Sequence, residues 1–396
     1  MDIYYQSKKF KRLLQRYEEL RDNNISEFLD SEDLTDVAEY YYSIGQDEKA
    51  LETANYTNHL YPTATAPLAF KARMALLTYN NPTLANEIAE TIVDKSDLDY
   101  LYLKAEIMIA DNQVSKADQY LQEQYDNVID EDDHDEFVID AAALFADYEE
   151  IDYAEKWLNQ STMINEDEYK EIKVRILKGQ GKYEASETLI NKLIDGNPYS
   201  CAYWNQLTQI QFLRNDVQGA ITSSEYALAI NPNDEEALLN KANGLFSLDN
   251  FVESLKYYQQ YRQTCHHVDF SIIDVTIGHL YLILGHPKEA LDFYFQSITE
   301  SENKDQALIN VAISIFDNGY FELTYRILIN YLPNAAKDWT EGFAYLARCC
   351  YELKKTEEYK QFLQIAIERN PRECQDVLSD LYPPGTDIKD YPSINI

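Results

Sequence analysis

The chain has 396 residues, of which 45% are hydrophobic and only 11 are glycine and 11 are proline. This composition argues against global disorder and, with so few helix-breaking residues, favours an all-helical protein with short turns. The formal net charge of −35 repels phosphate backbones and anionic lipid headgroups, so we expect neither a nucleic acid nor a membrane as partner.

The acidic charge is concentrated in the first half of the chain. Residues 23 to 168 carry 34 acidic and 7 basic side chains, a net charge of −27 that leaves only −8 for all other residues. A basic partner would therefore be drawn to the first half. The alternative purpose is solubility, because acidic outer faces keep a long repeat protein from associating with itself.

Residues 5 to 22 are predicted to form one amphipathic helix, with Phe10, Leu13 and Tyr17 at helical spacing and basic residues mostly opposite them. We expect this helix to cap the structure that follows. A basic amphipathic helix can instead lie on a membrane, or dock on an acidic region of a second copy. The opening residues lack the features of a secretory leader, and no run of about 18 apolar residues occurs, so we expect a soluble cytoplasmic protein.

Helix-turn-helix repeats of about 34 residues follow, and the clearest copy spans residues 201 to 234. Its first half places Trp204 and Leu207 at helical spacing, its second half places Ala220 and Ala227 likewise, and Pro232 closes it. We expect ten repeats, which begin near residues 31, 66, 98, 135, 167, 201, 235, 271, 305 and 340. The constant period indicates one helical array and not several unrelated domains.

Small residues recur at fixed places in these repeats. The small residues of the first helices are Ala38, Ala105, Ala142, Ala242, Gly278, Ala312 and Ala347. Those of the second helices, 12 positions after the corresponding place in the first helix, are Ala50, Ala117, Ala154, Ala220 and Ala290. Two helices approach closely only where neither carries a large side chain, so this spacing is a packing requirement.

This pattern resembles the tetratricopeptide repeat (TPR) family, and the number of copies is similar to that of bacterial-type multi-repeat members. The residues of the clearest copy that match the family motif are Trp204, Leu207, Ala220, Ala227 and Pro232, whereas Thr208 and Gln211 depart from it. The second repeat, residues 66 to 97, has lost most of the motif. The resemblance implies an all-α fold, an α-solenoid wound as a right-handed superhelix of about ten repeats with end-capping helices.

The expected domain organisation has three parts. Residues 1–30 form an N-terminal capping helix and linker, residues 31–373 form the repeat array, and residues 374–396 form a capping helix followed by an extended tail. A capping helix is expected because a solenoid must cover the apolar face of its last repeat.

The resemblance also implies a concave groove lined by the first helices, with positions 2, 5, 9, 12 and 13 of each repeat directed into it. The groove residues selected in this way are Arg175, Asn205, Gln209, Phe212, Asn243, Phe246, His279, Leu282, Ile313, Phe316 and Arg348. Such a surface binds an extended segment or a helix of a protein partner, although some of these residues could instead only contact neighbouring helices. The family's carboxylate clamp for chaperone tails is not present in three adjacent repeats.

Two polar clusters suggest other chemistry. The acidic run at residues 130 to 136 lacks the glycine and the final glutamate of a calcium loop, so we expect an exposed loop in which Asp135 caps the next helix. The adjacent Cys265, His266 and His267 give an alternative, a regulatory protein or enzyme with a small-molecule or metal site at this turn.

No phosphate-binding loop or nucleophile elbow occurs in the sequence. We therefore expect a non-enzymatic interaction scaffold with no cofactor, no metal and no catalytic residue. The five cysteines show no paired spacing and indicate a reducing compartment.

Overall fold

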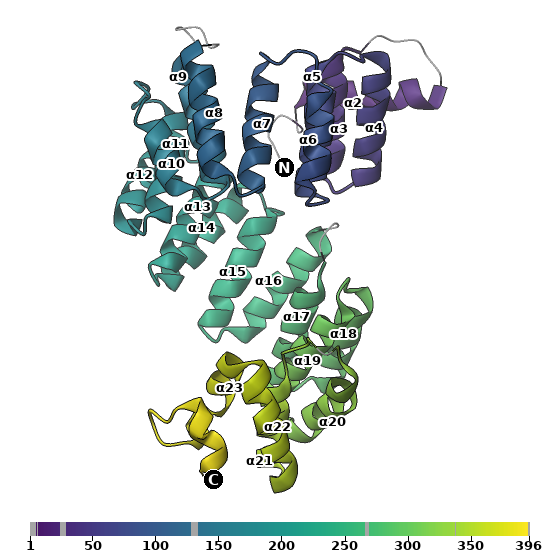
Figure 1. Cartoon of the computed structure of the whole chain (residues 1–396), viewed down its shortest axis with the longest axis vertical. Helices are drawn as coiled ribbons and strands as arrows, with labels where there is room; N and C mark the ends of the chain where they lie inside the picture. Colours follow the sequence, from purple (N-terminus) through teal and green to yellow (C-terminus); the bar gives the residue numbers. More distant parts are fainter. Residues whose placement is uncertain are drawn as a thin grey trace. The chain divides into compact units, whose positions relative to one another are not determined.

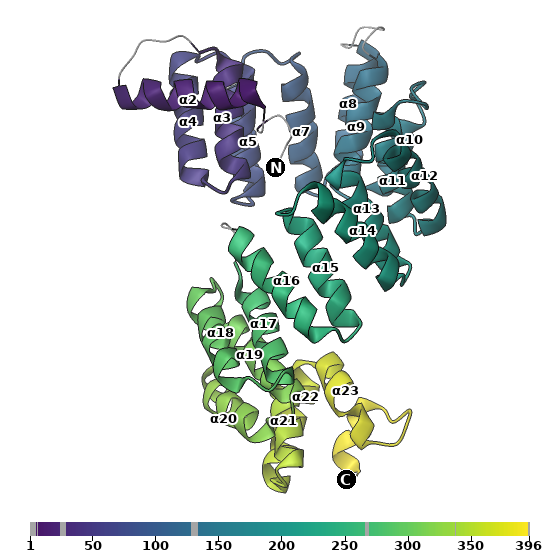
Figure 2. The same cartoon turned by 180° about the vertical axis from the view of Figure 1, so that it is seen from behind.

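The computed structural model describes residue 5 and residues 7–23, 29–127, 134–265, 269–336 and 338–394. All regular secondary structure in these ranges is helical, which confirms the all-α prediction. The chain divides into an N-terminal unit, Met1–Ile230, and a C-terminal unit, Asn231–Ile396. In both units, the helices follow one another as antiparallel pairs (Figures 1 and 2).

The N-terminal unit contains helix α2 (Lys8–Asn23) followed by six helix pairs. The pairs are α3 (Ser31–Ser43) with α4 (Asp47–Leu60), α5 (Thr65–Leu77) with α6 (Pro82–Glu90), α7 (Leu98–Ala110) with α8 (Val114–Asn127), α9 (His134–Asp147) with α10 (Ile151–Leu158), α11 (Asp167–Gly179) with α12 (Tyr183–Gly196), and α13 (Cys201–Leu213) with α14 (Val217–Ile230).

The C-terminal unit contains four helix pairs and a final helix, α23 (Pro371–Leu378). The pairs are α15 (Glu235–Ser247) with α16 (Phe251–Thr264), α17 (Ser271–Ile283) with α18 (Pro287–Glu300), α19 (Lys304–Asp317) with α20 (Phe321–Tyr331), and α21 (Phe343–Glu352) with α22 (Thr356–Arg369). Three 3₁₀ helices, η2 (Leu332–Asn334), η3 (Ser379–Leu381) and η4 (Ile388–Ser393), complete the unit. Paired helices in repeats make both units α-solenoid in architecture.

The first helices begin within one residue of the expected start in every repeat except the tenth, where α21 begins at Phe343. The chain before α21 contains η2 and then Gly342, whose φ of 85° is left-handed. Gly342 brings no capping side chain to this helix. The Glu373 carboxylate of α23 instead accepts hydrogen bonds from the backbone N–H groups of Gly342 and Ala344, at 2.8 and 3.1 Å.

One residue in each of the ten turns between paired helices has a positive φ. These residues are Gly45, Asn80, Asn112, Glu149, Gly181, Asn215, Asp249, Gly285, Gly319 and Lys354. The next N–H donates to a carbonyl five residues back, as from Asp216 to Gln211 at 2.8 Å. This is the Schellman ending, in which a left-handed residue lets the chain reverse and satisfies the last carbonyls of the helix.

The second repeat departs from this geometry by one residue. Its corresponding bond runs from the N–H of Asn81 to the carbonyl of Ala75, six residues back, and α6 then begins at Pro82. The buried small residues of this pair, Ala72 and Ala85, are accordingly 13 positions apart and not 12. This extra residue explains why the motif is hard to recognise here.

The small residues lie where paired helices are closest, and Ala38, Ala50 and Ala220 have no exposed surface. Repeats five, seven and nine place a hydroxyl at the second-helix position. Ser186, Ser254 and Thr324 donate hydrogen bonds to the carbonyl oxygen 12 residues earlier, at 2.9, 2.9 and 3.4 Å. At Gly278 a Cβ would lie 2.5 Å from the Tyr294 ring, so only glycine fits there without movement of the ring.

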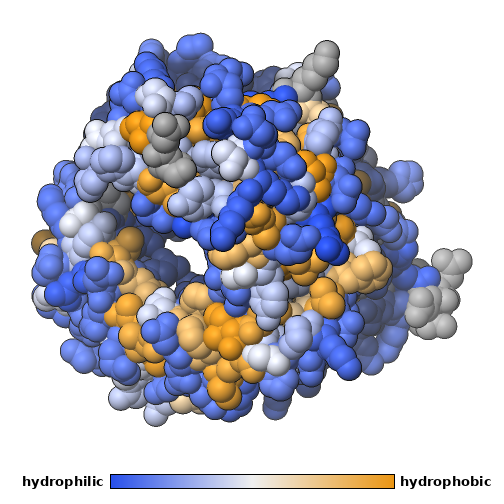
Figure 3. All heavy atoms as spheres, turned by 90° about the horizontal axis from the view of Figure 1, so that it is seen from below, coloured by the Kyte–Doolittle hydropathy of each residue, from blue (hydrophilic) through white to orange (hydrophobic). Residues whose placement is uncertain are grey.

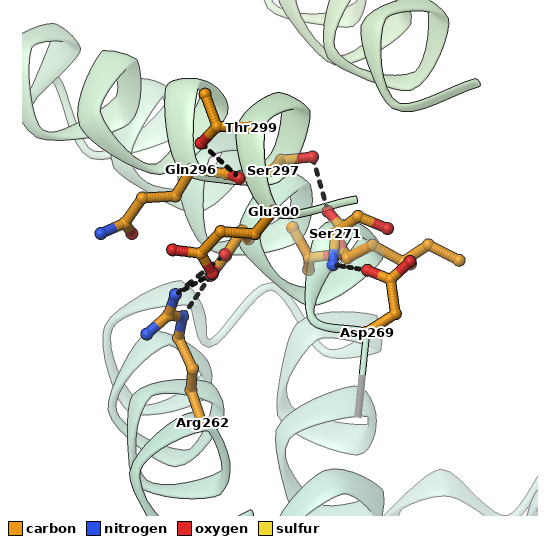
Figure 4. A network of polar contacts seen from close by, with 10 residues as sticks. Arg262, Asp269, Ser271, Gln296, Ser297, Thr299 and Glu300 are labelled. Carbon is orange, nitrogen blue, oxygen red and sulfur yellow. Dashed lines mark hydrogen bonds and ion pairs between the residues drawn. The ribbon is translucent and has the colours of Figure 1, made fainter. Parts of the chain in front are cut away.

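Repeat eight contains a buried carboxylate where other repeats have an apolar side chain such as Leu101 or Leu238. Asp274 has no exposed surface, and the Arg262 guanidinium contacts both of its oxygens, Nε to Oδ1 at 2.5 Å and Nη2 to Oδ2 at 3.1 Å. Arg262 also reaches Glu300 at 3.5 Å (Figure 4). Burial raises the pKa of Asp274, and Arg262 opposes that rise. The three residues connect α16, α17 and α18.

Helices cover the first and the last repeat of the array. Phe10 and Tyr17 of α2 are buried against residues of α3 and α4, and the Tyr17 hydroxyl lies 2.9 Å from Thr53 Oγ1. The C-terminal tail, expected to be extended from residue 383, instead contains η4, and its Tyr391 ring stacks on Tyr382 with centroids 3.7 Å apart. The tail folds back because Tyr391, 2% exposed, gains burial by covering the last repeat.

The final helix also begins earlier than the expected residue 374. Pro371 occupies its first turn and the Asn370 side chain accepts a hydrogen bond from the N–H of Glu373, a favourable start for a helix. Among the helices of the described ranges, none combines the length and apolar character needed to cross a bilayer.

Candidate functional site

In the N-terminal unit, the side chains predicted to line a groove contact other helices of the chain. Arg175 of α11 forms an ion pair with Asp147 of α9, Nη2 to Oδ1 at 2.5 Å. Gln209 of α13 accepts a hydrogen bond from Lys178 of α11 at 2.8 Å. Asn205 is only 4% exposed and Phe212 is half-buried, so this row offers a partner little free surface.

In the C-terminal unit, three predicted residues come together in one depression of about 250 Å³. They are Phe246, His279 and Ile313, which come from the successive first helices α15, α17 and α19. The rest of the wall consists of Val275, Thr276, Asn310, Ser314 and Asp317. The depression therefore combines three apolar side chains with five polar ones.

A second depression of about 350 Å³ adjoins the first, because Asp317 belongs to the wall of both. Two predicted residues, Phe316 and Arg348, line it together with Gly319, Phe321, Tyr345, Asp376 and Val377. The rings of Phe316 and Tyr345 meet edge to face, with centroids 5.2 Å apart. We call these two adjoining depressions the first-helix surface. On the side of the molecule drawn in Figure 3, apolar residues gather in patches between hydrophilic ones.

The remaining two predicted residues lie beside the first-helix surface but do not line it. The Asn243 side chain accepts a hydrogen bond from the Tyr258 hydroxyl at 2.5 Å. Leu282 is half-buried and contributes to a core cluster that contains Tyr294 and Ile315.

Hydrogen bonds fix the polar groups of the first depression. His279 Nδ1 accepts from the Asn318 side-chain amide at 2.9 Å and lies 3.2 Å from Ser314 Oγ, which in turn is 2.7 Å from the Tyr294 hydroxyl. With Nδ1 as acceptor, the neutral imidazole carries its proton on Nε2. The ring is thus held in one orientation beside Phe246, with centroids 6.0 Å apart.

The charges of the first-helix surface are not equally satisfied. Arg348 contacts Glu352 at 2.8 Å and Asp380 at 2.5 Å, and also donates to the carbonyl of Val377. Asp317 forms no ion pair with a lysine or arginine of the described ranges. Although the residue is exposed overall, partial burial raises the pKa of the Asp317 carboxyl, and His279 opposes the rise.

The sequence analysis missed several residues of this surface. Thr276, Asn310 and Tyr345 all occupy position six of their repeats, and Asp317 occupies position thirteen of repeat nine. Position six lies four residues after position two and three before position nine, so it shares their helical face. The period of the helix could therefore have identified the three residues at position six. Position thirteen was already among the positions expected to face the groove, so Asp317 was only left out of the selection.

A further depression in the C-terminal unit, about 580 Å³, contains none of the predicted residues. It lies between the second helices α20 and α22, lined by residues that include Ile329, Phe362 and Arg369. It is open because α20 has 11 residues where α16, α18 and α22 have 14. The Arg369 guanidinium lies over the Phe343 ring and donates to the Trp339 carbonyl, so it already has contacts within the chain.

The two polar clusters lie partly outside the described residues, which exclude 130–133 and 266–268. Asp135 does not cap α9 as expected, since its carboxylate accepts hydrogen bonds from Ser161 and from the backbone N–H of Thr162. Cys265 is buried, and burial with the neighbouring Glu235 raises its pKa to about 12, which disfavours the thiolate that binds metals. Within the described ranges, no three potential ligands form a metal-binding group.

No protein-family model matches the sequence, and no curated protein matches it. Several solved structures are similar to this chain in fold. YrrB, described as a TPR protein with an unusual peptide-binding site, is 13% identical, covers 49% of this chain and 98% of its own, and gives a TM-score of 0.35. PilF of Pseudomonas aeruginosa is 13% identical over 54% of this chain and 98% of its own, with a TM-score of 0.40.

The Cut9–Hcn1 hetero-tetramer of the APC/C is 14% identical over 95% of this chain and 88% of the other, with a TM-score of 0.37. At these identities the likeness concerns the fold alone. The residues themselves give the firmer criterion: first helices of mostly 13 residues, a left-handed turn residue, and small residues buried 12 positions apart. The chain is accordingly a helical repeat protein built from helix-turn-helix pairs, the arrangement that the resemblance to tetratricopeptide repeats predicts.

Proposed function

We propose that this protein is an interaction scaffold that binds an extended segment or a helix of a protein partner on the first-helix surface. One observation carries the proposal: five predicted residues from four successive first helices line two adjoining depressions. Concave apolar surfaces with a few fixed polar groups are the sites at which repeat scaffolds hold anchoring side chains.

The two depressions supply complementary kinds of contact. Phe246, Ile313 and Phe316 offer apolar area for anchor residues, which contribute most of the binding energy in such interfaces. The Nε2–H of His279 is a fixed donor for a carbonyl of the partner. Because its orientation is set by Asn318 and Ser314, little conformational entropy remains to be lost on binding.

A Ser–His pair within hydrogen-bond distance could also indicate a nucleophile, but its geometry favours a structural role. Ser314 is 5% exposed and is bonded to the Tyr294 hydroxyl, and His279 Nδ1 accepts from the Asn318 amide. A nucleophile needs an accessible oxygen and a base with a free lone pair. We therefore propose binding without catalysis.

Site-specific photo-crosslinking tests the proposal. A photoreactive residue at Ile313 is expected to crosslink a protein partner in cells, whereas one at Leu291, which is 56% exposed on α18 and outside the surface, is not. The partner so identified is then purified, and Phe246→Ala is expected to weaken its binding at least tenfold while the control Phe295→Ala leaves it unchanged. Equal crosslinking at both positions, or full affinity of Phe246→Ala, would contradict the proposal.

A further inference from the structure

We infer that the partner segment carries a bulky apolar residue close to a lysine or arginine, and that Asp317 is the acceptor for this basic side chain. The inference rests on the proposed function and adds to it the chemistry of the partner. It depends on where Asp317 lies and on which other charges of the surface are already satisfied.

Asp317 is the only residue shared by the walls of the two depressions, as far as the described residues show. Phe246, Val275 and Ile313 belong to one depression, and Phe316 and Tyr345 belong to the other. A segment that places an apolar side chain in either depression therefore passes close to the Asp317 carboxylate. One basic residue near the anchor is enough to reach it.

The unsatisfied charge of the surface is negative. Arg348 is compensated by Glu352 and Asp380, at 2.8 and 2.5 Å. Neither Asp317 nor Asp376, the two carboxylates of the depressions, pairs with a basic side chain of the described ranges. The C-terminal unit itself has more acidic than basic residues, which favours cationic over anionic segments.

The surroundings of Asp317 strengthen such a contact. A carboxylate that has lost part of its water makes a stronger ion pair than a fully exposed one, because the local dielectric constant is lower. An arginine can also bind it through two parallel hydrogen bonds. A segment that ends in a carboxylate at this place would meet two like charges and an arginine already engaged, so it is selected against.

Peptide selection tests the inference. A phage-displayed library of random dodecapeptides is selected against the full chain, and in parallel against Phe246→Ala to remove peptides that bind elsewhere. Peptides enriched only on the wild-type chain are expected to combine an aromatic or large aliphatic residue with a nearby lysine or arginine. A synthetic peptide of this kind should bind Asp317→Asn about tenfold more weakly than wild type, as loss of one charge-assisted hydrogen bond predicts.

Two further variants serve as controls. Asp317→Glu keeps the charge and should retain most of the affinity. Asp292→Asn removes an exposed carboxylate of α18 outside both depressions and should bind as wild type does. Because Asp317 is exposed, Asp317→Asn is expected to fold normally, which the thermal midpoint verifies.

The outcomes separate the inference from the proposed function. If Phe246-dependent peptides are found but lack a basic residue, or bind Asp317→Asn with full affinity, the inference is wrong and the proposed function stands. If no enriched peptide depends on Phe246, both are overturned.

Discussion

Equivalent positions of the repeat are used differently in the two units. Position nine is Arg175 and Gln209 in the N-terminal unit, where both side chains contact neighbouring first helices. In the C-terminal unit, His279 and Ile313 at the same position line the first depression. The position on the helix sets the direction of a side chain, but the neighbouring helix determines whether that side chain is satisfied within the chain or left for a partner.

The interior of the two units is, by contrast, alike. All ten turns contain a residue with positive φ, in both units. Small residues, or hydroxyls such as Ser186 and Ser254 that bond back to the first helix, occupy the closest approach. The close approach of the paired helices thus restricts which residue types can occupy the buried positions, whereas the outer positions accept many. The following predictions test that contrast.

The largest expected effect is at position four of repeat eight, where the C-terminal unit has Asp274 and not an apolar residue. Arg262→Gln leaves a buried carboxylate without its cation and should lower the free energy of unfolding by about 3 kcal/mol at pH 7. The control Arg326→Gln removes an ion pair whose arginine is 69% exposed and should cost less than about 1 kcal/mol. Urea unfolding of both variants measures the difference.

The effect of Arg262→Gln should also depend on pH. Burial raises the pKa of Asp274 and Arg262 lowers it, so its removal raises the pKa further. A carboxyl whose pKa is raised by folding stabilises the protein at acid pH, and this stability is lost as pH rises through the folded-state pKa. The variant should therefore approach wild type as the pH falls toward the ordinary aspartate range. A pH-independent difference would count against a buried charge.

The shared interior is tested by Ala220→Leu. Ala220 has no exposed surface between α13 and α14, so a larger side chain should overpack the pair and cost roughly 1 to 3 kcal/mol. Ala229→Leu adds the same atoms at an exposed site of the same helix and should change the stability by less than about 0.5 kcal/mol. Equal denaturation midpoints for the two variants would show that the assigned packing position is wrong.

The turn residue with positive φ gives a smaller effect of opposite sign, a rise in the free energy of unfolding. Glu149 has a φ of 59°, a conformation that glycine adopts without steric cost, so Glu149→Gly should stabilise the protein by about 0.5 to 1 kcal/mol. The adjacent Glu150 has a φ of −81°, and Glu150→Gly should not stabilise it. A rise in thermal midpoint for Glu149→Gly alone would confirm that the left-handed conformation at this position favours glycine.

The smallest effect tests the opening contrast directly. Arg175→Gln removes a partly exposed ion pair with Asp147 and should cost less than about 1 kcal/mol. It should leave peptide binding and crosslinking at Ile313 unchanged, because position nine of the N-terminal unit is used within the chain. Loss of binding in Arg175→Gln would show that this residue also contributes to partner binding.

Much of the fold could be predicted from the sequence, because the small residues and the glycines recur at a fixed period. The sequence Asn81-Pro82 indicates that the turn of the second repeat is distorted, but it does not reveal that one residue is added. That Ala72 and Ala85 are 13 positions apart is explained only by the turn geometry. The folded tail was also missed. Tyr391 is one aromatic residue in a segment rich in proline and polar residues, and its contact with Tyr382 has no local pattern.

The sequence by itself determined the helical pairs, since helix period, small residues and turn residues act over distances of one repeat or less. It also selected five of the residues that line the two depressions. Only the tertiary structure decided which of these side chains form ion pairs or hydrogen bonds within the chain. The carboxylates that hold Arg348 lie on α21 and on η3, and Asp317 lines two depressions because side chains of neighbouring first helices surround it. Such contacts depend on distances between helices, which the spacing of residues along one helix does not specify.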